Sequence, residues 1–278
     1  MRIRQTIGFG ILLTAALAGA GCGSKPTYPK EHLVESIQGL LIEQQLNASV
    51  RLVDQTLAVH IHHPDLLIQS GTQAELGPAF DEVARTVIGD ILHRVLLSTD
   101  ADIRFYLLLM SDPNAPGLYL TIIRYVDDIK RANVNMIDVP EMLARTVFEW
   151  NYIGTSSLSL EQYIPRGIRL EEFLSLQLAK RLQQTLAERL QTDGAANVGK
   201  FVGTYQNGEF ALVLDVTPAK SDRPLDEAMM REVFDTATGV VAKVLSGYRF
   251  ESFDTVRLIH PISGRNIVFH KASLKSFQ

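Results

Sequence analysis

The chain has 278 residues, of which 46% are hydrophobic and 21% charged, so it has ample material for a hydrophobic core and differs from a disordered chain. Its 27 basic and 31 acidic residues give a net charge of −4, and no basic block stands out, which argues against nucleic-acid binding. A single cysteine excludes a fold held together by internal disulfides.

The first residues have the pattern of an export signal. Arg2 and Arg4 precede an uncharged apolar segment, residues 7–18, which is shorter than the roughly 20 residues that a membrane-spanning helix needs. Two cleavage sites compete. An ordinary secretory signal would be cut after the small residues 18–20, whereas a lipoprotein signal would be cut directly before Cys22.

The ending Ala20-Gly21-Cys22 resembles the signal of bacterial lipoproteins, although that family favours leucine where this chain has Gly19. The resemblance implies removal of residues 1–21 and a covalent lipid on Cys22, with no other cofactor. An unpaired thiol is a liability in an oxidising compartment, and lipidation removes it.

The same resemblance implies a location. Gly23 is not the aspartate that commonly retains lipoproteins in the inner membrane, so we expect an outer-membrane protein that faces the periplasm. Residues 22–29 would form a short lipidated tether that keeps the folded part close to the membrane.

Residues 30–131 are predicted to form a first α+β module. Apolar residues at helical spacing indicate helices over 30–46 and from Gly77 to about 96, and each helix precedes a pair of strands. The expected strands lie near 50–53, 57–61, 103–110 and 118–126.

Residues 169–278 show the same order of elements. Helices are expected over 170–190 and after Arg223-Pro224, and strands over 200–205, 209–216, 253–260 and 266–270. Equivalent elements lie close to 150 residues apart, which favours an internal duplication. The predicted fold class is therefore α+β, with two tandem similar modules, each an antiparallel sheet of two hairpins with helices on one face.

Residues 132–168 are predicted to be a connector with a short helix from Pro140 to Glu149. It contains the only tryptophan, Trp150, followed by Tyr152. Because aromatic residues dominate binding hot spots, these two are candidate partner-binding residues. The favoured alternative is that Trp150 packs the two modules together.

Two patterns suggest metal chemistry. His60 and His62 lie two residues apart on one strand face and could share a zinc ion, provided that a third ligand comes from elsewhere; the alternative is a polar outer strand face. The segment Tyr125-Val126-Asp127-Asp128 matches the short aspartate motif of reverse transcriptases over four residues only. We interpret it instead as a strand end followed by a solvated charge cluster.

Searches for phosphate-binding loops, nucleophile turns and zinc-protease helices find nothing. The sequence therefore predicts a lipid-anchored bacterial envelope protein that acts as a non-catalytic scaffold for an envelope protein partner. The alternative is a periplasmic metal-binding protein or metal-dependent enzyme that uses His60 and His62.

Overall fold

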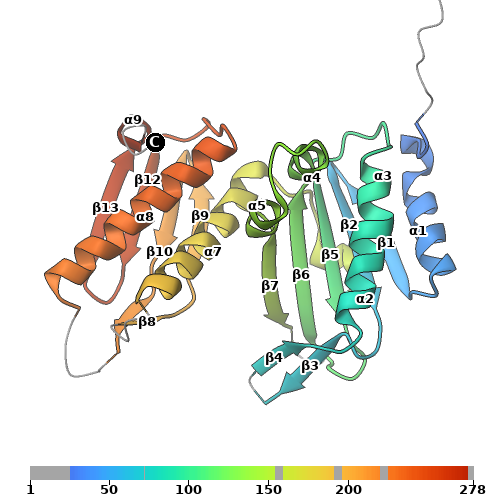
Figure 1. The fold of residues 1–278 in the computed structure, drawn as a ribbon, viewed down its shortest axis with the longest axis horizontal. Coiled ribbons are helices and arrows are strands. Elements are labelled where there is room, and N and C mark those ends of the chain that lie inside the picture. The colour runs from blue at the N-terminus through green and yellow to red at the C-terminus, as the bar shows by residue number, and fades with distance from the viewer. Residues whose placement is uncertain (1–25, 72, 154–158, 191–195, 220–224, 275–278) are drawn as a thin grey trace, which may run out of the picture.

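The computed structural model describes residues 26–71, 73–153, 159–190, 196–219 and 225–274. Figure 1 shows two larger β-sheets side by side, with helix α7 running between them and helix α8 beside it. Cys22, the signal 1–21 and the start of the tether lie outside the described residues, as does the expected helix start at Arg223-Pro224. Among the described helices, none combines the length and apolar character required to cross a membrane.

The N-terminal sheet has five strands in the order β1-β2-β5-β6-β7. Its strands are β1 (Ala48–Val53), β2 (Thr56–His62), β5 (Phe105–Ser111), β6 (Leu118–Tyr125) and β7 (Val147–Tyr152). The other elements before α7 are η1 (Lys30–His32), α1 (Leu33–Glu43), the hairpin β3 (Leu67–Ser70) and β4 (Gln73–Leu76), α2 (Phe80–Ala84), the π-helical η2 (Arg85–His93), α3 (Arg94–Leu96), α4 (Val126–Asn133), α5 (Val139–Ala144) and α6 (Leu160–Tyr163).

The C-terminal sheet has four strands in the order β13-β12-β10-β9. They are β9 (Val202–Gln206), β10 (Glu209–Val213), β12 (Thr255–His260) and β13 (Arg265–His270). The remaining elements are α7 (Leu170–Leu190), the paired strands β8 (Ala196–Val198) and β11 (Val216–Pro218), α8 (Glu227–Gly247) and α9 (Lys271–Leu274). Asn207 and Gly208 both have positive φ, which the tight β9–β10 turn requires and which the Asn-Gly pair predicts.

The α+β class is confirmed, but neither larger sheet is purely antiparallel. β2 pairs with β5 in parallel, and β10 pairs with β12 in parallel. The physical reason is the connection, since a helix returns the chain to the same end of the sheet before the next hairpin begins. Both sheets share this order of hairpin, helix and hairpin. An origin by duplication stays a prediction.

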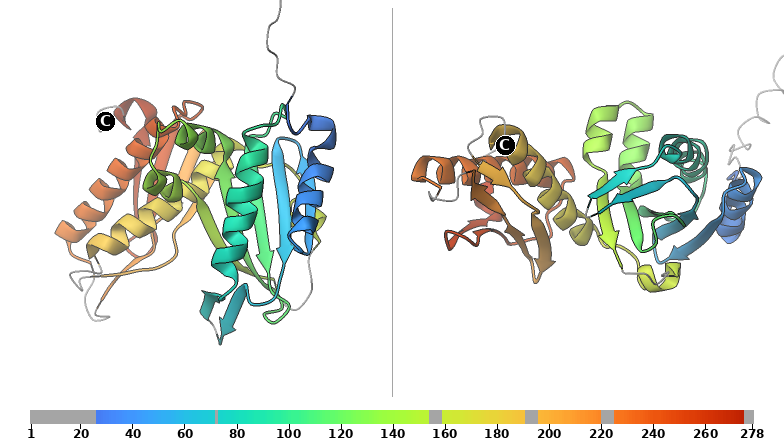
Figure 2. Two further views of the ribbon diagram at one scale, coloured as in Figure 1. Left: turned by 45° about the vertical axis from the view of Figure 1, so that its right-hand side comes forward. Right: turned by 90° about the horizontal axis from the view of Figure 1, so that it is seen from below.

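The hydrophobic core crosses from one sheet to the other. One face of the N-terminal sheet packs against α1 and η2 through residues such as Val59, Leu108 and Val87. The opposite face joins a second cluster that also takes residues from α7, α8 and the C-terminal sheet, including Phe105, Phe173 and Phe210. Figure 2 shows the two sheets and the helices beside them from two further directions. A shared core makes independent movement of the two sheets costly.

The segment between the expected modules differs most from prediction. Only 139–144 of the expected helix is helical, and Val147–Tyr152 forms strand β7 at the edge of the N-terminal sheet. The residues of β7 alternate between the two faces of the sheet, a period of two that favours a strand over a helix. Trp150 therefore belongs to the sheet rather than to a connector.

Candidate functional site

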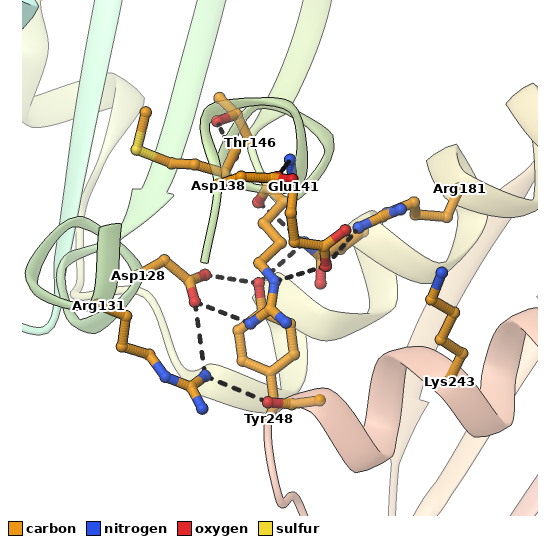
Figure 3. Close-up of polar contacts among 12 residues, drawn as sticks. Asp128, Arg131, Asp138, Glu141, Thr146, Arg181, Lys243 and Tyr248 are labelled. Atoms are coloured by element: carbon orange, nitrogen blue, oxygen red, sulfur yellow. Dashed lines mark hydrogen bonds and ion pairs between the residues drawn. The ribbon is translucent and has the colours of Figure 1, made fainter. Parts of the chain in front are cut away.

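A group of polar residues lies where helices α4, α5, α7 and α8 meet, and Figure 3 shows most of it. We call Asp128, Glu141, Arg145, Gln177 and Tyr248 the junction cluster. Asp128 accepts hydrogen bonds from the Tyr248 hydroxyl at 2.7 Å and from Arg145 Nη1 at 2.9 Å. Since Tyr248 ends α8 and Asp128 begins α4, these bonds join segments 120 residues apart.

Arg145 is the centre of the junction cluster. Its Nε donates to Glu141 Oε1 at 2.8 Å, and its guanidinium carbon lies 4.9 Å from the centre of the Tyr248 ring. Gln177 Nε2 donates to the Arg145 carbonyl at 2.8 Å and to the Tyr248 hydroxyl at 2.9 Å. Arg181 Nη2 adds a second donor to Glu141 at 3.1 Å. The cluster therefore ties all four helices together.

The prediction of a solvated charge cluster after Tyr125 is wrong for Asp128. β6 ends at Tyr125 and α4 begins at once, with Asp127 and Asp128 in its first turn, where acidic groups complement the helix dipole. That turn directs Asp128 inward, and only 3% of the residue is exposed. Asp127 stays exposed, as expected.

Burial controls the charges in the cluster. It raises the pKa of Asp128, although the hydrogen bond from Tyr248 and the charge of Arg145 oppose the shift. Burial and the neighbouring Asp128 charge raise the pKa of Tyr248, so the phenol keeps its proton and stays a donor. Burial lowers the pKa of Arg145, but the bond to Glu141 and the Asp128 charge outweigh it, and the net shift is upward. The arrangement suits a fixed polar lock between helices.

Beside the junction cluster, α5, α7 and α8 enclose a cavity of about 720 Å³. We call it the helical groove. Its lining combines charged and small residues: Glu141, Arg145, Gln177, Arg181, Thr185, Arg189, Ala228, Arg231, Glu232, Asp235, Thr236, Gly239, Val240, Lys243, Val244 and Tyr248. No motif in the sequence points to this groove. One feature of the sequence could have indicated the site: Gln177 is a polar residue on the apolar face of α7, which also carries Phe173 and Leu174.

The structure brings His60 and His62 together around Ser111. His60 Nε2 lies 2.7 Å and His62 Nδ1 lies 2.9 Å from the Ser111 hydroxyl oxygen, and the three line a cavity of about 470 Å³. His63 points elsewhere, with its Nδ1 2.6 Å from the Pro64 carbonyl oxygen. Within the described ranges, no three His, Cys, Asp or Glu side chains are placed to hold a metal ion. The zinc alternative stays a prediction that lacks a third ligand there.

Burial lowers the pKa of two histidines on the N-terminal sheet side. The pKa of His93 falls to about 4, mainly because of burial and to a smaller extent because of the charge of Arg124. Arg124 Nη1 lies 3.1 Å from His93 Nε2. Burial and the charge of His62 also lower the pKa of His60 to about 4. Both imidazoles are therefore neutral at physiological pH.

We expect the protein to lose stability as the pH falls from 7 to 5. In that range the unfolded chain, whose histidines have a pKa near 6.5, binds protons that folded His60 and His93 do not, so protonation favours unfolding. His93→Gln keeps an acceptor for Arg124 and should reduce the loss by roughly half, measured as the urea midpoint at the two pH values. An unchanged pH dependence in this variant would contradict the assignment; His32→Gln, at an exposed position, is the control.

The predicted partner-binding residues lie on the open edge of the N-terminal sheet. Trp150 is 37% and Tyr152 62% exposed, and both side chains lie on the same face of β7. Trp150 also lines a cavity of about 590 Å³ with residues of α7 and the start of β9. Trp150 belongs to neither hydrophobic cluster of the described residues, and the favoured expectation that it packs the two modules together stays a prediction.

Comparison with known proteins gives no relative. No protein-family model matches the chain, and no match was found among the curated proteins or the solved structures.

Proposed function

We propose that this protein is a lipid-anchored bacterial envelope protein that holds a partner protein near the membrane as a non-catalytic scaffold. The observation that carries the proposal is the edge strand β7, which exposes Trp150 and Tyr152 and contacts α7 at its Phe148 end. Anchoring through Cys22, in an outer membrane facing the periplasm, rests on the lipoprotein-like signal alone.

The backbone of β7 is suited to accept another strand. In the described part of the chain it pairs with β6 and with no other strand. The amide of Ile153 donates to Gly117 on the β6 side, so the alternate residues Phe148, Trp150 and Tyr152 direct their backbone groups away from β6. A partner strand could form main-chain hydrogen bonds there, and the aromatic side chains would supply contact area.

Lys180 partly protects this edge. Its ammonium group donates to the Phe148 carbonyl at 3.0 Å and lies 5.1 Å from the centre of the Phe148 ring. Lys180 belongs to α7, and covering a strand edge with a helix is a common defence against unwanted strand pairing. A partner must displace this contact, which favours a specific strand over indiscriminate association.

The tether would keep the edge close to the lipid. The Tyr28 amide contacts the Ser98 carbonyl at 3.5 Å, and the Lys30 amide donates to Asp100 Oδ1 at 2.8 Å. The chain is thus attached to the fold six residues after Cys22, which is a reach of about 20 Å at most when extended.

The test places a photo-crosslinking amino acid at position 152 in whole cells. We expect one discrete crosslinked protein, with a yield that Trp150→Ala lowers several-fold because the neighbouring aromatic contact is lost. The control carries the same amino acid at position 262, since Ile262 is 60% exposed on a distant turn.

Equal crosslinking from positions 152 and 262 would contradict the β7 interface. The anchor has a separate readout: Cys22→Ser should move the protein from the membrane fraction to the soluble periplasmic fraction. If its fractionation does not change, the proposed lipid anchor is wrong.

A further inference from the structure

The helical groove carries more positive charge than the chain as a whole. Its lining has five basic residues, Arg145, Arg181, Arg189, Arg231 and Lys243, against three acidic ones, Glu141, Glu232 and Asp235, whereas the whole chain has a net charge of −4. Such a local excess in a concave site attracts anions.

Part of that charge is available to a ligand. Arg145 and Arg181 are paired with Glu141, but the side chains of Arg231 and Lys243 form no ion pair or hydrogen bond with the described residues. Figure 3 shows Lys243 extending from α8 without a contact to the cluster. The groove thus presents cations that the fold itself does not neutralise.

Two covered polar atoms beside the groove also lack partners. Gln177 Oε1 and Arg181 Nε are buried without a hydrogen bond in the described structure, although both side chains line the groove. A buried donor or acceptor that is left unpaired is destabilising, so a ligand that pairs it gains affinity. An incoming group with both an N–H and an anionic oxygen would supply the donor that Gln177 Oε1 lacks and the acceptor that Arg181 Nε lacks.

Small residues line the middle of the groove, so a ligand can come close to both helices there. Gly239 lies on the exposed side of α8, and a β-carbon there would meet no atom within 4 Å. Thr185 faces it from the lining of α7. These small residues leave room for a chain to lie along the groove between the charged residues at its two ends.

We propose that the helical groove binds an extended acidic segment of a partner protein. Arg181 contacts Glu141 and Arg189 Nη1 donates to Thr236 at 3.0 Å, but each guanidinium has further N–H donors. The two arginines are eight residues apart on α7, a rise of about 12 Å. Carboxylates four residues apart on one side of an extended chain are about 13 Å apart, so they match this spacing. Backbone amides of the segment supply the donor that Gln177 Oε1 lacks, and Lys243 faces the chain from α8.

The experiment measures fluorescence anisotropy of a labelled octapeptide of alternating glutamate and serine added to the purified full-length protein. The neutral counterpart has glutamine in place of each glutamate. We expect saturable binding of the acidic peptide alone, weakening as salt rises because the attraction is electrostatic. Equal binding of both peptides would overturn the proposal.

Matched variants locate the binding. Gly239→Glu should bind the acidic peptide about tenfold more weakly than Gly239→Gln, which has the same size without the charge. Lys243→Gln should weaken binding about fivefold, while Arg94→Gln, which removes an exposed charge from α3, should change it less than about twofold.

Equal affinities of the two Gly239 variants, or equal losses in Lys243→Gln and Arg94→Gln, would show nonspecific charge attraction and overturn the proposal. If millimolar inorganic phosphate displaced the acidic peptide, the groove would be a simple anion site, and the proposal would also be overturned. The test is independent of β7, so crosslinking from position 152 can succeed or fail without deciding it.

Discussion

Replacing Arg145 by alanine should lower the free energy of unfolding by about 3–5 kcal/mol, because it removes the hydrogen-bonded cation of the buried Asp128 carboxylate and leaves only Arg131, whose Nη1 lies 4.0 Å from Asp128 Oδ1. Asp128 is 3% exposed, and the side chain of Arg145 is only 10% exposed, so water cannot readily take the place of the lost partner. Urea unfolding at pH 7 measures the effect.

Two comparisons separate this burial effect from a general loss of charge. Arg166→Ala removes a bidentate ion pair with Glu172 whose arginine side chain is 61% exposed, and should cost at most about 1 kcal/mol. Adding Asp128→Asn to Arg145→Ala should recover part of the lost stability, since the stranded charge is gone. If Arg145→Ala lowered the free energy of unfolding by no more than Arg166→Ala does, the junction cluster would not stabilise the contact between the helices.

Phe173→Ala should also cost about 3–5 kcal/mol, and it should loosen the contact between the two sheets. The fully buried Phe173 ring lies 5.3 Å from Phe105 of the N-terminal sheet and 6.1 Å from Tyr248 at the end of α8, centre to centre. Its removal leaves a cavity where the shared core crosses from one sheet to the other.

Phe210→Ala is the matched control, because Phe210 is equally buried but its ring contacts Tyr205, Phe250 and Phe253 on the C-terminal side. Both variants should lose similar stability. Only Phe173→Ala should accelerate hydrogen exchange in the amides of β5 relative to the rest of the N-terminal sheet. Identical exchange patterns in the two variants would contradict a core that couples the sheets.

The local periodicity of the sequence predicts most helices and hairpins because each depends on residues near one another. The turn at Asn207-Gly208 and the four-residue leucine spacing of α7 are examples. β7 was missed although its residues alternate, because the helix expected over 140–149 covered its first half, whereas the helix in fact ends at Ala144.

The junction cluster could not be predicted in the same way. Whether Asp128 is solvated or buried depends on Arg145 and Tyr248, which reach it from other helices. No local pattern around Asp128 encodes these partners. The parallel pairing of β2 with β5 likewise depends on how a helix returns the chain, and not on the composition of either strand.

The position of the tether gives the junction cluster a mechanical role in the proposed anchored protein. The chain joins the fold at Tyr28, on the N-terminal sheet, whereas the helical groove lies between α7 and α8. Force between the lipid and a ligand pulling on α8 would therefore pass through the contacts of Tyr248 with Asp128 and Gln177. Those bonds and the shared hydrophobic core around Phe173, rather than the strands, would set the load at which the two halves separate.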